Sequence, residues 1–346
     1  MTKKIILLSV LFLVSIMIKA QEDIHIDAGS ARLDFFGYGQ ATYDVKDVGG
    51  EKTNTAEVLR VILMTDVHLT PKMDFFLMVD AASKFSDKVL HEYWASYKFN
   101  DALKVKIGQY KTDFTIENPI SPTVVGNIFF HESSGYLAGM YGDPAYGNLA
   151  GRDFGLSFSG DFLKNKEGRY LFGYSAGLFN GTGMNVSENN NQKDFIGRID
   201  YRPTKQVILS TSTYLGTGCA MADDKYGKFK TGENYKRQRW AAGVEAKLDL
   251  MYLRTEYLRG WNAGTPSQGV YAESWLHILP KYKIDLVLDY EYFDKNIHIN
   301  DATRNYMAGL QWWVHKQCRI SSLFQYKDPT MGDRTRRFVT QFQLRF

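Results

Sequence analysis

The sequence predicts an all-β protein, a 16-stranded antiparallel transmembrane β-barrel, on three observations. Apolar and polar residues alternate over short segments from Leu33 to the C-terminus. The connections between these segments alternate between short and long. The 346-residue chain has 44% apolar residues and a mean hydropathy of −0.32, which is too polar on average for a bundle of membrane helices.

The first 20 residues differ in pattern from the rest of the chain. Lys3 and Lys4 precede an apolar run over residues 5–14 that only Ser9 interrupts, and Ala20 is followed by Gln21. This pattern is typical of an export signal. We therefore expect residues 1–20 to be a cleaved signal peptide and residues 21–346 to be one barrel domain of the outer membrane of a Gram-negative-type cell. A single membrane anchor is the alternative, because the run is close to spanning length.

The last residues show the alternation best. Phe338, Thr340, Phe342, Leu344 and Phe346 share one parity, and Arg337, Val339, Gln341, Gln343 and Arg345 share the other. A period of two predicts a strand with one buried face. The same template predicts sixteen strands, over Leu33–Tyr43, Glu57–Leu69, Lys72–Ala81, Val89–Asn100, Ala102–Lys111, Arg152–Leu163, Arg169–Phe179, Asp194–Arg202, Gln206–Gly216, Arg239–Leu248, Leu250–Arg259, Val270–Leu279, Tyr282–Asp294, Arg304–Val314, Cys318–Lys327 and Arg336–Phe346.

The connectors favour a closed barrel. Short turns such as Thr70-Pro71 alternate with long loops such as 180–193 and 217–238, which is the plan of an outer-membrane barrel. All eight Pro fall in the predicted connectors, as a ladder without a free edge requires. No helical pattern is left to cover the apolar faces, so lipid must cover them, and the strands must close on themselves to pair every backbone group. A soluble propeller is the structural alternative, but the chain lacks the blade period that it would show.

Charged residues on the opposite parity are candidates to line the lumen, and their signs are nearly balanced. The full set on this parity has fourteen basic and thirteen acidic members, including Lys327, Arg337, Glu273 and Asp289. Within it, the candidate lumen-lining charges of the site are Arg60, Lys98, Lys104, Lys106, Arg198, Arg202, Arg239, Lys247, Arg254, Glu256 and Arg319. The chain without its signal segment is nearly neutral and has no basic stripe, so we expect no nucleic-acid partner.

Several motifs resemble the phosphate-selective porin O and P family. They are Gly108-Gln109-Tyr110-Lys111 with Glu117, Arg152-Asp153-Phe154-Gly155, Phe179-Asn180-Gly181, Gly197-Arg198-Ile199-Asp200-Tyr201-Arg202-Pro203 and Glu256-Tyr257-Leu258-Arg259-Gly260. The resemblance covers nearly all of residues 21–346. It implies a sixteen-stranded porin, a homotrimer, and a third long loop folded inward to narrow the pore. Phe338, Phe342 and Phe346 resemble the signal that the barrel assembly machinery reads.

The third long connector runs from Thr112 to Gly151 and is the longest in the chain. It carries several acids but no Lys or Arg, although a phosphate-selective pore would need positive charge at its narrowest point. The candidate constriction residues are Phe129, Phe130, His131, Glu132, Tyr136, Tyr141 and Tyr146. The aromatic members could also form a track on which sugars stack.

We therefore expect a water-filled channel for passive diffusion of small hydrophilic solutes or ions, with weak charge preference. A solute-specific channel for phosphate, other anions or sugars stays open, as does a barrel enzyme or surface adhesin. His91 has lipid-facing parity, but no serine of matching depth can be assigned to it, and no nucleophile elbow or metal-binding His pair is found. We expect no catalytic residues, no metal and no cofactor.

Overall fold

The structure is a computed structural model that describes residues 24–29, 31–82, 89–143 and 151–346. The predicted signal peptide over residues 1–20 and the candidate constriction residue Tyr146 lie outside the described residues. Within the described residues, no helix is both long and apolar enough to cross a bilayer.

Strands make up most of the described chain. They are β1 (Ile24–Ala28), β2 (Ala31–Val48), β3 (Glu51–Thr70), β4 (Met73–Asp80), β5 (Leu90–Asn100), β6 (Leu103–Lys111), β7 (Arg152–Lys164), β8 (Tyr170–Phe179), β9 (Asp194–Tyr201), β10 (Val207–Cys219), β11 (Asn234–Lys247), β12 (Met251–Asn262), β13 (Thr265–Leu279), β14 (Ile284–Asp294), β15 (Ala302–His315), β16 (Cys318–Pro329) and β17 (Thr335–Arg345). Three short helical turns are η1 (Pro122–Val124), α2 (Glu132–Leu137) and η2 (Pro280–Tyr282).

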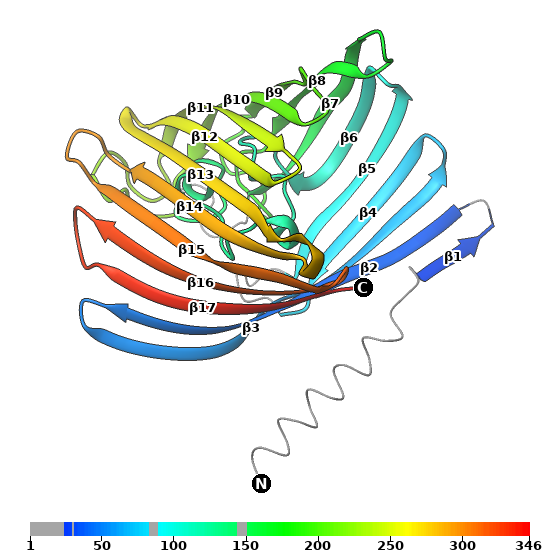
Figure 1. Ribbon diagram of the computed structural model, residues 1–346. Coiled ribbons are helices and arrows are strands. Elements are labelled where there is room, and N and C mark those ends of the chain that lie inside the picture. The colour runs from blue at the N-terminus through cyan, green and yellow to red at the C-terminus, as the bar shows by residue number, and fades with distance from the viewer. Residues whose placement is uncertain (1–23, 30, 83–88, 144–150) are drawn as a thin grey trace.

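Strands β2 to β17 form a closed antiparallel barrel of 16 strands (Figure 1), and this prediction is confirmed. Each strand pairs with the next in sequence, and β17 pairs with β2 from Thr335↔Val48 to Arg345↔Tyr38 to close the ring. The unpredicted strand β1 pairs with the first residues of β2, from Ile24↔Phe35 to Ala28↔Ala31. Strand β1 therefore pairs with the same edge of β2 as β17 does, but with residues 31–35 of β2, whereas β17 pairs with residues 38–48.

The two faces of the strands differ as the alternation predicts. In β17, Val339, Gln341 and Gln343 are at most 2% exposed and face the interior, whereas Phe338 is 47% exposed on the outside. Large aromatic side chains such as Trp240 and Trp312 are also exposed on the outer surface. An apolar outer face of this kind is what a hydrocarbon environment would cover.

The first hairpin is longer than the sequence pattern predicts. The predicted connector between Tyr43 and Glu57 is instead strand, and β2 and β3 meet at a turn of Gly49 and Gly50. Both glycines have positive φ, 59° and 98°, which a tight turn readily uses. Residues 44–57 are mostly polar on both faces, so their pairing leaves no apolar alternation to detect.

Two β-bulges change the parity of the residues that they contain. Gln40 pairs with Arg60 and Ala41 with Val58, so Leu59 has no partner and turns inward, at 3% exposure. Met78 pairs with Glu92 and Val79 with Leu90, so His91 turns inward too, and its predicted lipid-facing orientation is wrong. A bulge adds one residue to one strand only, which shifts every later side chain to the other face.

The prediction that every Pro lies in a connector is also wrong. Pro266 is the second residue of β13, and Pro329 ends β16. The ladder between β13 and β14 begins only at Gln268, so Pro266 lies where one edge of its strand is outside that ladder. A residue without an N–H is tolerated at such an edge.

Candidate functional site

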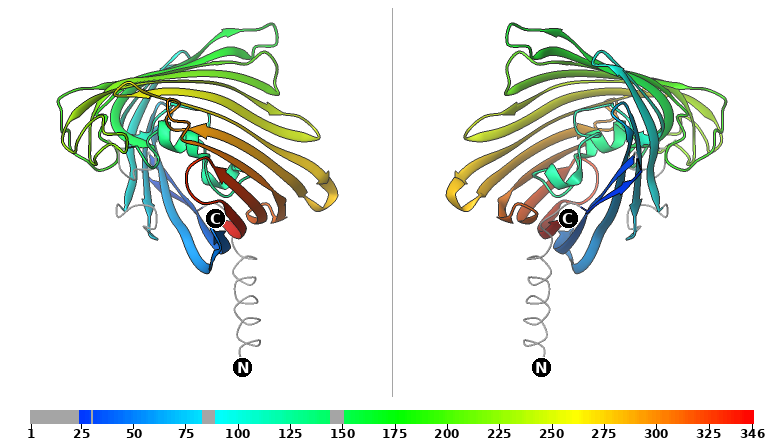
Figure 2. Two further views of the ribbon diagram at one scale, coloured as in Figure 1. Left: turned by 90° about the vertical axis from the view of Figure 1, so that its left-hand side faces the viewer. Right: turned by 90° about the vertical axis from the view of Figure 1, so that its right-hand side faces the viewer.

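The segment between β6 and β7 is here called the third loop, and its described residues, 112–143 and 151, pack against the inner wall of the barrel. Figure 2 shows α2 within the ring of strands. Backbone groups along the loop bond to inward side chains: Ile116 N–H donates to Glu256 at 2.8 Å, Ser133 N–H to Glu291 at 2.8 Å, and the carbonyl of Val125 accepts from Arg319 at 2.8 Å. The wall between β12 and β17 therefore satisfies the polar backbone of a segment that has little secondary structure.

His131 is the centre of the most heavily charged contact. Its Nδ1 lies 2.9 Å from Glu117 Oε1 and its Nε2 lies 2.7 Å from Asp289 Oδ2. Both ring nitrogens face carboxylates, so both must carry a proton, and the side chain is an imidazolium. Arg254 bonds Glu117 at 3.4 Å and forms an ion pair with Glu273. These five side chains, here called the His131 cluster, are fully buried.

The charges around His131 set its protonation. Burial alone would lower the pKa of His131, but Coulombic attraction to Asp289 and Glu117 outweighs it and holds the pKa well above 6.5. Burial would raise the pKa of Glu117, yet His131 and Arg254 hold it below 4.5. Tyr271 also stacks on the imidazole, with ring centroids 3.9 Å apart. The cluster therefore carries its charges in the folded state.

These shifts predict how docking of the third loop depends on pH. A raised pKa of His131 stabilises the docked loop fully below the ordinary value of 6.5, and this contribution is lost as pH rises through the raised value. A lowered pKa of Glu117 stabilises docking above 4.5, and this contribution is lost as pH falls further. We expect protection of the loop amides from hydrogen exchange, corrected for intrinsic rates, to be constant between about pH 5 and 6.5 and to fall progressively as pH rises above 6.5. His131→Gln should lack this decrease; an identical decrease in this variant would exclude His131 as its cause.

An apolar patch lies beneath the same loop. Ile128 packs with Leu59, Val287, Leu323 and Val339, which come from four different strands of the inner wall. A Cβ at Gly126 would lie 1.7 Å from Nε1 of Trp275, so only glycine lets the loop approach the wall here. This part of the interior is a packed core and not a water-filled surface.

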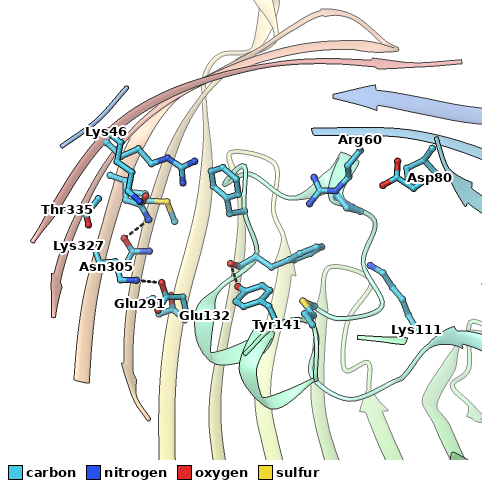
Figure 3. Close-up of a pocket in the computed structure, with 18 of the residues that line it drawn as sticks. Lys46, Arg60, Asp80, Lys111, Glu132, Tyr141, Glu291, Asn305, Lys327 and Thr335 are labelled. Atoms are coloured by element: carbon cyan, nitrogen blue, oxygen red, sulfur yellow. Dashed lines mark hydrogen bonds and ion pairs between the residues drawn. The ribbon is translucent and has the colours of Figure 1, made fainter. Parts of the chain in front are cut away.

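Beside the third loop a chamber of about 350 Å³ stays open, lined by residues of β2 to β7 and of β14 to β17. Figure 3 shows Arg60 and Lys111 on one side of this chamber and Lys46 and Lys327 on the other. The loop contributes Pro122, Phe129, Phe130, Glu132, Met140 and Tyr141 to the lining. The barrel wall contributes the basic side chains Lys46, Arg60, Lys111, Arg152, Lys327 and Arg337 and the acids Asp80 and Glu291.

The described members of the predicted constriction lie at three positions. Phe129, Phe130, Glu132 and Tyr141 line the chamber, whereas His131 is buried in its cluster. Tyr136 accepts from the amide of Asn262 at 3.1 Å and lines a second cavity, of about 670 Å³, beneath the loop between β10 and β11. The hydroxyl of Tyr141 donates to the carbonyls of Phe130 and His131, so it also fixes the loop itself.

The predicted lumen charges lie in several different environments. Arg239, Arg254, Glu256 and Arg319 are at most 2% exposed beneath the third loop, and Arg60 lines the chamber. Lys98, Lys104, Arg198 and Arg202 line a third cavity together with Asp101, Asp161 and Asp200. Lys106 packs on the rings of Trp94 and Tyr110, and the exposed Lys247 pairs with Glu245 at 3.1 Å.

The chamber also contains basic residues that the sequence analysis missed as site residues. Lys46 falls in the predicted connector that proved to be strand, and Lys111, Arg152, Lys327 and Arg337 lie at or near strand ends. Lys327 and Arg337 have the lumen-facing parity of the sequence analysis, whereas the sequence signal of Lys111 and Arg152 is only a basic residue close to a strand end. The acids Glu273 and Asp289 share the inward parity, but nothing in the sequence identified them as partners of His131.

The predicted assembly residues lie at the seam of the barrel. Gly37 N–H donates to the carbonyl of Phe346 at 2.8 Å, and Phe346 N–H donates back to Gly37 at 3.0 Å. Phe338 and Phe346 are 47% and 43% exposed on the outside, and Phe342 is partly exposed. The backbone of Phe346 therefore forms the last hydrogen-bonded pair between the end of the chain and β2.

A closed 16-stranded antiparallel barrel of this kind is the fold of the outer-membrane porins. No family model and no curated protein matches the sequence. The anion-selective porin from Comamonas acidovorans aligns with a TM-score of 0.66 at 12% identity, over 91% of this chain and 100% of that one. OprB of Pseudomonas putida aligns with a TM-score of 0.67 at 12% identity, over 92% and 94%. OmpT of Vibrio cholerae in its trimer form aligns with a TM-score of 0.65 at 13% identity, over 92% of this chain and 100% of that one.

These structures support the porin fold and not the phosphate-selective family in particular. Because the sequence identities are only 12–13%, these alignments establish similarity of fold alone.

Proposed function

We propose that the protein is an outer-membrane porin that forms a water-filled channel for passive diffusion of small hydrophilic solutes. The observation that carries this proposal is the chamber beside the third loop. A barrel that is apolar outside leaves, within its ring, a charged space that the loop narrows and does not fill. Pore-lining charge and the width of such a narrow region decide what passes.

The lining of the chamber favours a modest preference for anions. Six basic side chains face three acidic ones. At least three of the six have carboxylate partners: Arg152 with Glu92 at 2.9 Å, Arg337 with Asp44 at 2.9 Å, and Lys327 with Glu132. Pairing reduces the field that these three add to the pore, so the excess of positive charge is small. This agrees with weak charge preference and gives its sign.

Planar-bilayer recording tests the proposal. We expect the refolded protein to give stepwise conductance in KCl, and a reversal potential under a salt gradient that indicates modest anion preference. Lys46→Gln should move the reversal potential toward zero, whereas Lys247→Gln, an exposed residue outside the chamber, should leave it unchanged. Folded barrels without conductance would contradict the porin, and a cation-selective pore would contradict the proposed sign.

The same proposal extends to the partners. Residues 1–20 would direct export, outer-membrane lipid would cover the apolar face, and the barrel assembly machinery would read Phe338, Phe342 and Phe346. We propose a homotrimer, in keeping with the trimer form named for Vibrio cholerae OmpT. Detergent-purified protein should then elute at three times the mass of one chain, and a monomer would contradict this part.

A further inference from the structure

We infer that the chamber beside the third loop is a binding site for small organic monocarboxylates that carry an aromatic or comparable apolar group. This inference rests on the proposed function, because it names a solute class for the same pore. It depends on the way the chamber places basic groups of the barrel wall opposite an apolar face of the third loop.

The basic side of the chamber includes two lysines, Lys46 and Lys111, that have no carboxylate partner among the described residues. Lys111, at the end of β6, donates to the carbonyl of Ile120 at 2.6 Å. Arg60 also reaches the chamber and donates to Gln40 at 2.7 Å. A carboxylate placed between Lys111 and Arg60 would accept charge-assisted bonds from both.

The facing side of the chamber is apolar. The third loop presents Phe129, Phe130, Met140 and Tyr141, and the barrel wall adds Ile62. The hydroxyl of Tyr141 already donates to two loop carbonyls, so Tyr141 would contact a solute through its ring. Aromatic rings and a thioether favour contact with another ring, through dispersion and edge or stacked geometry.

The basic side and the apolar side of the chamber come together at Lys111 and Phe130, and the volume of the chamber limits the size of the solute. Nζ of Lys111 lies 5.1 Å from the ring centroid of Phe130. A carboxylate bound to Lys111 would therefore place an attached ring directly against Phe130. A chamber of about 350 Å³ is at the small end of the range for ligand pockets, which suits a single-ring acid.

Other solute classes fit these groups less well. A sugar would leave Lys46 and Lys111 without an anionic partner, and inorganic phosphate would leave the aromatic face without an apolar partner. Cations are disfavoured by the small excess of basic side chains. The arrangement therefore selects negative charge and apolar surface together.

The test measures binding inside the conducting pore, with benzoate, acetate, benzyl alcohol and inorganic phosphate as probes. Each is added at constant ionic strength during planar-bilayer recording, and the dissociation constant is taken from the decrease in single-channel current. We expect benzoate to bind about tenfold or more tightly than acetate, and benzyl alcohol and phosphate to bind more weakly than benzoate. Lys111→Met should weaken benzoate binding about tenfold or more. Phe130→Ala should remove most of the advantage of benzoate over acetate.

The control variants are Lys98→Met and Phe99→Ala, which change a lysine and a phenylalanine on β5 outside the chamber. Both should bind benzoate like the wild type, and unboiled gel mobility confirms that every variant is folded. Equal binding of benzoate and acetate, tighter binding of phosphate, or unchanged benzoate binding in both Lys111→Met and Phe130→Ala would overturn the inference while the pore itself stands. Absence of any salt conductance would instead remove the proposed porin.

Discussion

His131→Leu is expected to release the third loop from the barrel wall. The substitution removes the cation between Glu117 and Asp289 and leaves two carboxylates buried without it. Breaking a buried ion pair by removing one partner costs about 3–5 kcal/mol. This is a large loss for a loop that individual hydrogen bonds and small apolar contacts hold to the wall. The loop should then fluctuate in the lumen, and single-channel recordings should show a larger mean conductance with much greater current noise.

The matched control is His277→Leu. His277 also contacts a carboxylate, Asp285 at 2.6 Å, but it lies near the end of β13 and is 35% exposed. It has no contact with the third loop among the described hydrogen bonds, so its loss should leave conductance and noise unchanged. If His131→Leu recorded like the wild type, the cluster would not be what holds the loop.

Gly37→Ala is expected to weaken the closure of the barrel. A Cβ at this position would lie 2.3 Å from the carbonyl oxygen of Ile62 and 2.7 Å from the ring of Phe346. The backbone oxygen belongs to the ladder between β2 and β3 and cannot move freely, so the change should cost about 3 kcal/mol or more. The temperature at which the folded gel band converts to the unfolded one should fall clearly.

Gly39→Ala tests whether the effect belongs to the seam. Gly39 lies two residues further along β2, and the nearest atom to its Cβ would be the carbonyl oxygen of Arg60, at 4.0 Å. The temperature at which the folded gel band of this variant converts to the unfolded one should equal that of the wild type within experimental error. Equal losses in the two variants would assign the effect to strand propensity and not to the contact with Ile62 and Phe346.

The regular part of the fold could be predicted because its cause is local. Each of the sixteen predicted segments overlaps one strand of the ring, since a strand with one face in lipid and one inside must alternate. The errors occur where that cause fails. Residues 44–57 are polar on both faces, and the bulges at Leu59 and His91 depend on the register of a neighbouring strand.

The site could be predicted only in part because its cause is not local. Length and composition identified the third loop and the aromatic residues Phe129, Phe130 and Tyr141 that line the chamber. The partners of His131 are 14 and 158 residues away in sequence, so no spacing rule connects them. The chamber's cations also come from separate strands, and only closure of the ring brings Lys46 and Lys111 to one space.

The central claim is that water and solutes pass through the chamber beside the third loop. The most direct test uses neighbouring residues of β16 as single cysteines, in a background where Cys219 and Cys318 are Ser. Gln325 lines the chamber, and Phe324 is 50% exposed on the outer face. A bulky charged methanethiosulfonate reagent added during recording should reduce the current through Gln325→Cys and leave Phe324→Cys unchanged. Unchanged current through a labelled Gln325→Cys channel would contradict the account.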